Sequence, residues 1–265
     1  MLKYKAQEEL KLRSPKETFE KYLSVGTGKT QQTVLKTFLL AIMAGMYIAF
    51  AGVASTFANA LVNKVCGALM FCGGLSMVLV AGSELFTGNC LLIIPLSDKK
   101  IKASAMLRNL VTVYIGNFVG ALIVALCAVY SGALDSVAET AVNTALAKSS
   151  LTFLSAFLKG FLCNVLVCVA VWMSFTSDKT ADKIIAVIFP VAFFVLCGFE
   201  HSIANMYFIP AGMLLDGIHN ITENGISLFG FFINNLLPVT FGNILGGFAV
   251  GGVYYAVFSK KQKKK

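Results

Sequence analysis

Charged residues are scarce in this sequence. Of its 265 residues, 22 are lysine or arginine and 13 are aspartate or glutamate, so 13% are charged, compared with about 25% in a typical soluble domain. Hydrophobic residues make up 57% of the chain, and the mean hydropathy is +0.77. This composition excludes an ordinary soluble domain and indicates a polytopic membrane protein.

Signals of several other protein classes are also missing. The first 30 residues contain no apolar core, so we expect no cleavable signal peptide. Neither a CxxC pair nor an HxxxH spacing occurs, so we expect no metal, no cofactor and no membrane-embedded enzyme. Buried free thiols are the simplest interpretation of the seven cysteines, which lie in or beside apolar segments: Cys66, Cys72, Cys90, Cys127, Cys163, Cys168 and Cys197.

Basic residues gather at the two ends of the chain. The net charge is +9, lysines and arginines crowd the first 36 residues, and the tail 260–265 is almost entirely lysine. Such flanks favour anchoring at the cytoplasmic surface of a lipid bilayer, not nucleic-acid binding. The expected outer loops hold only Lys64 and Lys148, with Lys159 near that side. We therefore expect a multi-pass protein of the cytoplasmic membrane with both termini in the cytoplasm.

Six apolar segments are long enough for α-helices to cross about 30 Å of hydrocarbon. We predict an all-α membrane protein whose six-span domain covers 31–259, between an N-terminal segment 1–30 and the cytoplasmic tail 260–265. Residues 5–23 are expected to form an amphipathic helix along the membrane surface. The six predicted transmembrane segments are 34–57, 66–96, 104–131, 151–175, 183–210 and 230–258.

Polar interruptions divide the second and fifth segments. Gly82–Asn89 and Gly198–Asn205 share a spacing of glycine, glutamate two residues later and asparagine five after that. Gly116–Gly120 and Gly242–Gly246 both read Gly-Asn-x-x-Gly. The offset is 116 residues at the glutamates and 126 at the Gly-Asn motifs, which places about ten extra residues of the second copy in a 213–229 loop.

The chain is therefore predicted to hold two three-helix repeats, about 31–131 and 151–258. An odd number of spans per repeat forces the second copy upside down, a common plan of channels and transporters. Broken backbone at membrane depth is tolerated only where protein or a water-filled path satisfies it. We expect the two breaks to meet near the midplane and to line a pathway.

Residues that are the same in both breaks are expected to have a different role from residues that occur in only one of them. Glu84 matches Glu200 and Asn89 matches Asn205, which favours a scaffold role in which carboxylates accept hydrogen bonds from freed amides, although buried carboxylates are also often functional. By contrast, His201 aligns with Leu85, and Thr87 aligns with Ile203. We predict that His201 and Thr87 meet in the pathway. Histidine can donate a hydrogen bond, or a proton, to a weak-acid anion.

These motifs together resemble those of the formate/nitrite transporter family. The likeness covers all six spans, roughly 30–258, and rests on four stretches: Ser83–Asn89, Gly116–Gly120, Cys163–Cys168 with Trp172 and Met173, and Gly198–Pro210. The resemblance implies an aquaporin-like protomer, a homopentamer and one anion pathway in each protomer. It also implies small monovalent anions as cargo: formate, nitrite or, in one branch, hydrosulfide.

The resemblance further implies roles for individual residues. His201 would be the central histidine and Thr87 its hydrogen-bonding partner. Phe71 and Leu75 would form the constriction on the cytoplasmic side, and Phe194 the outer one. A residue beside the first break and three polar pathway residues complete the set: Phe86, Lys148, Asn164 and Asn243. The Thr-Gly-Asn continuation at 87–89 differs from the continuations that we associate with formate and nitrite members, which favours hydrosulfide narrowly.

Three functions remain open from the sequence. The first is a channel or proton-linked facilitator for small weak-acid anions. In such a channel, the positive charge of Lys148 near the outer mouth would raise the local concentration of anions. The second is a facilitator of water or a neutral solute, although the paired Asn-Pro-Ala signature of aquaporins is absent. The third is a secondary carrier coupled to protons or sodium.

Overall fold

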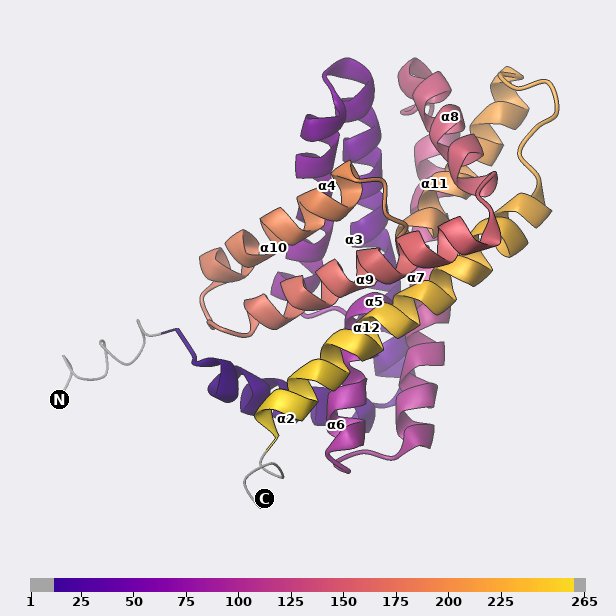
Figure 1. Cartoon of the computed structure of the whole chain (residues 1–265). Coiled ribbons are helices and arrows are strands. Elements are labelled where there is room, and N and C mark those ends of the chain that lie inside the picture. Colours follow the sequence, from indigo (N-terminus) through magenta and orange to yellow (C-terminus); the bar gives the residue numbers. More distant parts are fainter. Residues whose placement is uncertain (1–11, 260–265) are drawn as a thin grey trace.

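The computed structural model describes residues 12–259, and helices account for nearly all of its regular structure (Figure 1). Five of the described helices are long and apolar enough to cross a membrane: α3, α4, α7, α9 and the continuous run from η3 through α12. The fifth predicted segment is divided between two helices, α10 and α11, neither of which meets that criterion. The count of six spans therefore stays a prediction.

The first half of the chain runs from α2 to α7. Its helices are α2 (Pro15–Gln31), α3 (Val34–Leu61), α4 (Lys64–Ala81), α5 (Phe86–Asn89), η1 (Cys90–Leu92), α6 (Ile93–Ser97) and α7 (Ala103–Tyr130). The second half contains η2 (Asp135–Val137), α8 (Ala138–Ser149), α9 (Phe153–Ser174), α10 (Thr180–Leu196), α11 (Ser202–His219), η3 (Gly230–Leu236) and α12 (Leu237–Phe258).

The two predicted helix breaks are confirmed. After α4, Gly82 has φ 72°, and after α10, Gly198 has φ 67°. This left-handed conformation costs glycine little because it lacks a Cβ atom, and it turns the chain out of the helix. The chain resumes helical structure at Phe86 in the first half and at Ser202 in the second. The four or five residues outside the helices at each break thus expose backbone groups that other parts of the chain must satisfy.

The N-terminal helix differs from the prediction. Residues 12–14 are not helical, α2 extends to Gln31, and the predicted part at 5–11 lies outside the described residues, as does the tail 260–265. Its buried face includes Phe19 and Tyr22, and the Tyr22 ring contacts Phe175 edge to face at 5.3 Å. The helix is therefore packed against the end of α9 and does not simply lie on a membrane surface.

Two further boundaries are corrected. The region between the third and fourth segments, expected to be an outer loop, contains the twelve-residue helix α8. The expected 213–229 loop begins only at Asn220, because α11 continues to His219. Residues 213–219 of the predicted loop thus belong to a helix.

The repeat extends further than the sequence indicated. α3 and α9 each begin after a threonine N-cap, Thr33 or Thr152, whose side chain accepts from a backbone amide of the first turn. Each is preceded by a short helix, α2 or α8, with a lysine in its last turn. In Figure 1, α2 lies at one end of the molecule and α8 at the other, as an inverted repeat requires. We call these ends the α2 side and the α8 side.

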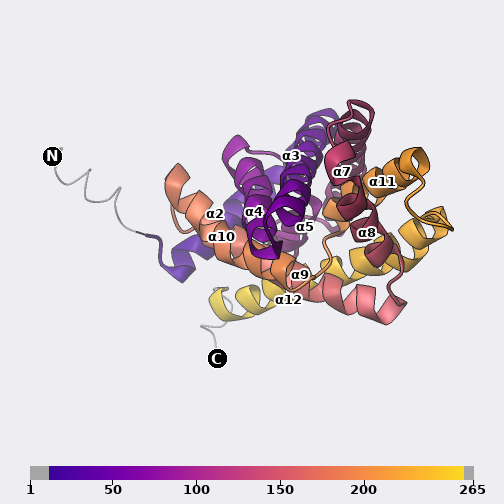
Figure 2. The same ribbon diagram turned by 90° about the horizontal axis from the view of Figure 1, so that it is seen from above.

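Glycines allow the long helices of each half to touch backbone to backbone. A Cβ atom added at Gly120 of α7 would lie 2.0 Å from the Ile42 carbonyl oxygen of α3. In the second half, a Cβ atom at Gly246 of α12 would lie 2.3 Å from the Phe161 carbonyl oxygen of α9. Such small-residue contacts are typical of helices packed within membranes. The pairs α3–α7 and α9–α12 form two sides of the molecule, and α5 contacts both α7 and α9 between them (Figure 2).

Candidate functional site

The two breaks meet in the interior through Thr87 and His201. Thr87 lies in the short helix α5, His201 is the N-cap of α11, and both side chains are buried. Thr87 Oγ1 is 3.0 Å from His201 Nε2. The structure therefore places the two asymmetric residues in contact.

Hydrogen bonds fix the protonation of the histidine ring. His201 Nδ1 accepts the backbone N–H of Ala204 at 3.1 Å, so Nδ1 carries no hydrogen. A neutral ring must then carry its hydrogen on Nε2, which donates to Thr87 Oγ1. The Thr87 hydroxyl keeps its own hydrogen for another acceptor. The arrangement is a relay of donors that runs from the Ala204 amide through the ring to the Thr87 hydroxyl.

A small apolar cavity lies beside the ring. Its volume is about 10 Å³, which is about the space of one water molecule. Its lining combines positions from both halves of the chain: Ile48, Phe71, Leu75, Leu85, Val167, Val191, Phe194 and His201. A charged solute that entered this cavity would lose its hydration shell. His201 is the one polar residue on the lining, so transfer of an ion from water into the cavity is energetically costly. We call this the inner cavity.

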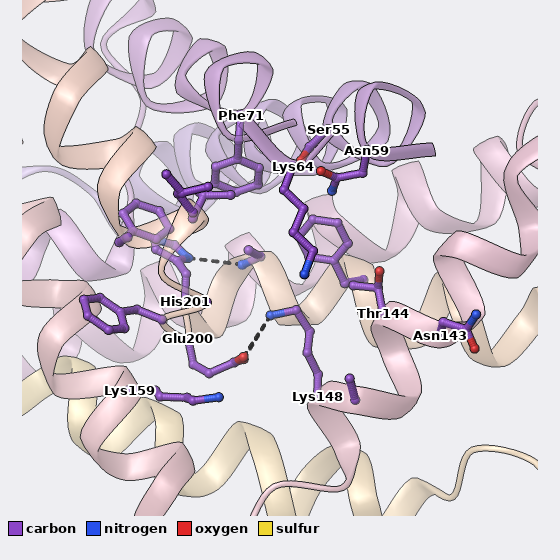
Figure 3. Close-up of a pocket in the computed structure, with 18 of the residues that line it drawn as sticks. Ser55, Asn59, Lys64, Phe71, Asn143, Thr144, Lys148, Lys159, Glu200 and His201 are labelled. Carbon is purple, nitrogen blue, oxygen red and sulfur yellow. Dashed lines mark hydrogen bonds and ion pairs between the residues drawn. The ribbon is translucent and has the colours of Figure 1, made fainter. Parts of the chain in front are cut away.

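A second, larger cavity opens on the α8 side, with a volume of about 580 Å³ (Figure 3). Phe71, Phe194 and His201 line both cavities. The rings of Phe71 and Phe194 meet edge to face at 6.0 Å, and Phe194 stacks on His201 at 5.9 Å. These rings thus separate the two cavities. We call the larger one the α8-side vestibule.

The position of Phe71 corrects the sequence prediction. Phe71 was expected with Leu75 on the cytoplasmic side, which was predicted to be the side of the N-terminus. It lies instead with Phe194 against the α8-side vestibule, because α4 starts at that end and Phe71 is only two turns from its first residue. Leu75, one turn deeper, lines the inner cavity.

A buried lysine–glutamate–asparagine network supports the first break. Lys29 Nζ lies 2.8 Å from Glu84 Oε2 and 3.0 Å from Asn89 Oδ1. Asn89 Nδ2 donates to the same carboxylate at 2.7 Å and to Asn109 Oδ1 at 2.9 Å. Only 4% of the Glu84 side chain is exposed, so the carboxylate depends on these partners. The network joins α2 to the broken helix.

The second break has a similar network, in which the lysine contacts the carboxylate but not the asparagine. Lys148 Nζ lies 3.0 and 3.1 Å from the two oxygens of Glu200, whose side chain is 5% exposed. Asn205 Nδ2 donates at 2.7 Å to Glu200 Oε2 and at 2.7 Å to Asn235 Oδ1. Lys148 thus binds a carboxylate, as Lys29 does. The sequence prediction omitted Lys29, Asn109 and Asn235. Extending the alignment of the two halves to the neighbouring helices would have matched Lys29 with Lys148 and Asn109 with Asn235.

Two asparagines hold the extended backbone of the breaks. Asn117 Oδ1 accepts Phe86 N–H at 2.9 Å, and Asn243 Oδ1 accepts Ser202 N–H at 2.9 Å. The amide group of each also donates to the carbonyl of the break's glutamate, Glu84 or Glu200. Asn243, expected in the pathway, thus uses both of its donor hydrogens on backbone carbonyls.

The remaining predicted residues have mixed positions. Asn164 Nδ2 donates to the carbonyls of Thr87 at 3.2 Å and of Asn243, so it links α5 to α12. Phe86 is buried against Tyr114, with ring centroids 4.8 Å apart, and lines neither of the two cavities described above. Within residues 12–259, no group of three or more histidine, cysteine, aspartate or glutamate side chains is arranged to hold a metal ion.

This combination defines a class: a multi-pass membrane protein built from two halves whose broken helices enclose a narrow polar contact in an apolar interior. Comparison with known families agrees. The family described as formate/nitrite transporter matches residues 16–257. The chain belongs to this family.

Individual relatives match nearly the whole chain. The probable formate transporter of Methanothermobacter thermautotrophicus is 36% identical, over 94% of this chain and 98% of that protein. The formate channel FocA of Escherichia coli strain K12 is 34% identical, over 89% of this chain and 91% of that one. A solved pentameric formate channel with formate bound gives a TM-score of 0.77 at 34% identity, covering 84% of this chain and 96% of that one. A solved FNT family ion channel gives 0.82 at 29% identity, covering 91% and 98%.

Proposed function

We propose that this protein is a channel for small monovalent anions of weak acids, with formate as the first cargo to test. The observation that carries the proposal is the contact between Thr87 and His201 at an apolar constriction. Relatives across the family that are named formate channels support the choice of cargo. Nothing in the site favours hydrosulfide or nitrite over formate, so these anions are comparison substrates.

The pathway is proposed to work in three stages. Lysines near the α8-side vestibule raise the local concentration of anions. An anion then passes Phe71 and Phe194 into the constriction, where water is excluded and an unpaired charge is unstable. The Thr87 hydroxyl lies behind the cavity lining, with its oxygen accepting from the His201 ring, and it would turn its hydrogen toward an anion held beside that ring. A charge-assisted bond of this kind is roughly twice as strong as a neutral one.

His201 is proposed to act as a neutral hydrogen-bond donor rather than as a resident imidazolium. A second ring proton would have to sit on Nδ1, which holds the Ala204 amide in the first turn of α11. Protonation of the ring would therefore disrupt the start of a helix. A proton that crosses with the anion would have to come from solution, as part of the undissociated acid.

The proposal extends to an assembly and a location. We propose a homopentamer with one pathway in each protomer, supported by the solved pentameric relative. We also propose a location in the cytoplasmic membrane with both termini in the cytoplasm, supported by the basic ends of the chain.

Uptake into proteoliposomes tests the function. We expect formate uptake to exceed that of protein-free liposomes at least tenfold. We expect His201→Asn to lower it about twofold to tenfold, because loss of the neutral hydrogen bond that orients the Thr87 hydroxyl costs about 0.5–1.5 kcal/mol. The matched control is His219→Asn, since His219 is the second histidine, is partly exposed and pairs with Asp135 near the protein surface. Osmotic swelling without anion uptake would support a neutral-solute facilitator instead.

A further inference from the structure

Two lysines on the α8 side have no counterpart in the other half of the repeat. Lys64 is the first residue of α4, and Lys159 lies in the second turn of α9. At the matching positions, α10 begins with Thr180 and α3 carries Leu40. Lys64 and Thr180 match as the first residues of their helices. Leu40 and Lys159 match through the backbone, because the amide of Glu84 donates to the Leu40 carbonyl, as that of Glu200 donates to the Lys159 carbonyl.

The unmatched lysines are therefore not part of the symmetric scaffold. Lys29 and Lys148 occur in both halves and each neutralises a buried glutamate. Lys64 and Lys159, by contrast, have no ion pair with any residue in the described part of the chain. Like His201 and Thr87, they break the symmetry of the fold, and both line the α8-side vestibule.

The vestibule is larger than the proposed cargo requires. Its volume of about 580 Å³ falls within the range of about 300–1,000 Å³ that is typical of pockets for whole organic ligands. Its lining includes the rings of Phe71, Phe194 and Phe208. Phe71 and Phe208 stack at 6.1 Å, and the Lys148 ammonium lies 5.5 Å above the Phe208 ring. The vestibule thus offers an aromatic floor to a solute larger than formate.

Charge on the lining is unbalanced. Lys64, Lys148 and Lys159 surround the vestibule, and Glu200 is the one carboxylate among its lining residues (Figure 3). Because Glu200 pairs with Lys148 through both oxygens, Lys64 and Lys159 remain as two uncompensated positive charges. A ligand with two anionic groups on an apolar body complements this lining in both charge and surface type.

We propose that the α8-side vestibule is a binding site for an organic dianion with an aromatic body, and that its occupancy blocks the pore from that side. The ligand would rest on Phe71 and Phe194, the rings that separate the vestibule from the inner cavity. Its carboxylates would contact Lys64 and Lys159. The blocking role depends on the proposed anion channel, whereas the binding site does not.

Isophthalate, an aromatic dicarboxylate, is the probe that we would use. We expect it to reduce formate current through the protein in planar bilayers when added on the α8 side, and to have no such effect from the α2 side. Benzoate, with one carboxylate, should block more weakly, and uncharged isophthalamide should not block. Equal block from both sides would overturn the proposal.

Charge-neutralising variants identify the binding residues. Lys64→Gln and Lys159→Gln should each weaken the block about twofold to fivefold, as expected for partly solvated ion pairs. The control is Lys179→Gln, an exposed lysine at the N-cap of α10 on the opposite side. If both variants are blocked like the unmodified protein, the assignment of these lysines is wrong.

Calorimetric titration of isophthalate into the protein in lipid nanodiscs separates this inference from the channel proposal. Binding that weakens in Lys64→Gln and Lys159→Gln supports the site even if no anion current is found, in which case only the channel proposal fails. Anion current without detectable isophthalate binding overturns the site and leaves the channel proposal intact.

Discussion

At the scale of single residues, symmetry separates structural from functional side chains. Lys29 and Lys148 hold Glu84 and Glu200 in both halves. His201 and Thr87 occur once each and contact each other. The sequence identified both glutamates, the histidine and the threonine, because they stand in two short motifs that align directly. It missed Lys29 and assigned Lys148 to the pathway, since the two lysines come from short helices in which little else is repeated.

Removal of one charge from the second network is expected to destabilise the protein. Glu200→Gln would leave Lys148, which is 17% exposed, without its counter-charge. Because breaking a buried ion pair costs about 3–5 kcal/mol and residual exposure reduces this, we expect a loss of about 2 kcal/mol or more. Thermal unfolding of the purified protein should show a lower midpoint temperature.

A double substitution provides the internal check. Lys148→Gln combined with Glu200→Gln removes both charges and should be less harmful than the sum of the single changes. Glu139→Gln, at an exposed position in the first turn of α8, should leave the midpoint nearly unchanged. Additive effects of Lys148→Gln and Glu200→Gln would show that the two side chains do not stabilise each other.

At the scale of helices, the breaks and the glycine contacts were predictable, whereas the short helices were not. Gly82 and Gly198 indicate left-handed turns. The Gly-Asn-x-x-Gly motifs indicate the close approach of α7 to α3 and of α12 to α9. α8 lies in a stretch too short to cross a membrane, so hydropathy gave no signal for it. The side assigned to Phe71 was wrong because the direction of α4 was not followed residue by residue from its start at Lys64.

Substitution of an interhelical glycine should separate the two helices that it joins. In Gly120→Ala, the new methyl group would meet the Ile42 carbonyl oxygen at 2.0 Å, a backbone atom that cannot move without shifting α3. We expect overpacking to cost about 1–3 kcal/mol or more. Thermal unfolding and the yield of folded protein measure the effect.

Gly73→Ala is the matched control for this prediction. Gly73 also lies inside a long helix, α4, but a Cβ atom there meets nothing within 4 Å. Alanine should stabilise the helix by up to about 1 kcal/mol because it restricts the unfolded chain. If Gly120→Ala and Gly73→Ala behaved alike, close approach of α3 and α7 would not be important for stability.

At the scale of the whole molecule, the apolar surface indicates further burial. Leu35, Leu107, Leu154 and Phe189 are each more than 60% exposed in the isolated chain. Lipid and neighbouring protomers are the surroundings that would cover such residues. The composition predicted a membrane protein but not which faces meet lipid and which meet another copy, because both surroundings are apolar.

The proposed pentamer predicts a definite mass. Native mass spectrometry of the detergent-solubilised protein should show one main species of five chains, each of 28.4 kDa. Persistence of this species on dilution would fit a permanent assembly. A predominantly monomeric protein that still transports formate would contradict the pentamer but not the pathway within the protomer.

The most direct test of the account is the formate current of purified protein in planar bilayers, with Thr87→Val and Thr87→Ser compared between about pH 5 and about pH 8. The account predicts a current in the unmodified protein, about tenfold or greater loss in Thr87→Val, which keeps the side-chain shape without the hydroxyl, and substantial retention in Thr87→Ser. Equal currents in Thr87→Val and the unmodified protein would contradict the central claim that the Thr87 hydroxyl, oriented by His201, carries the anion through the constriction.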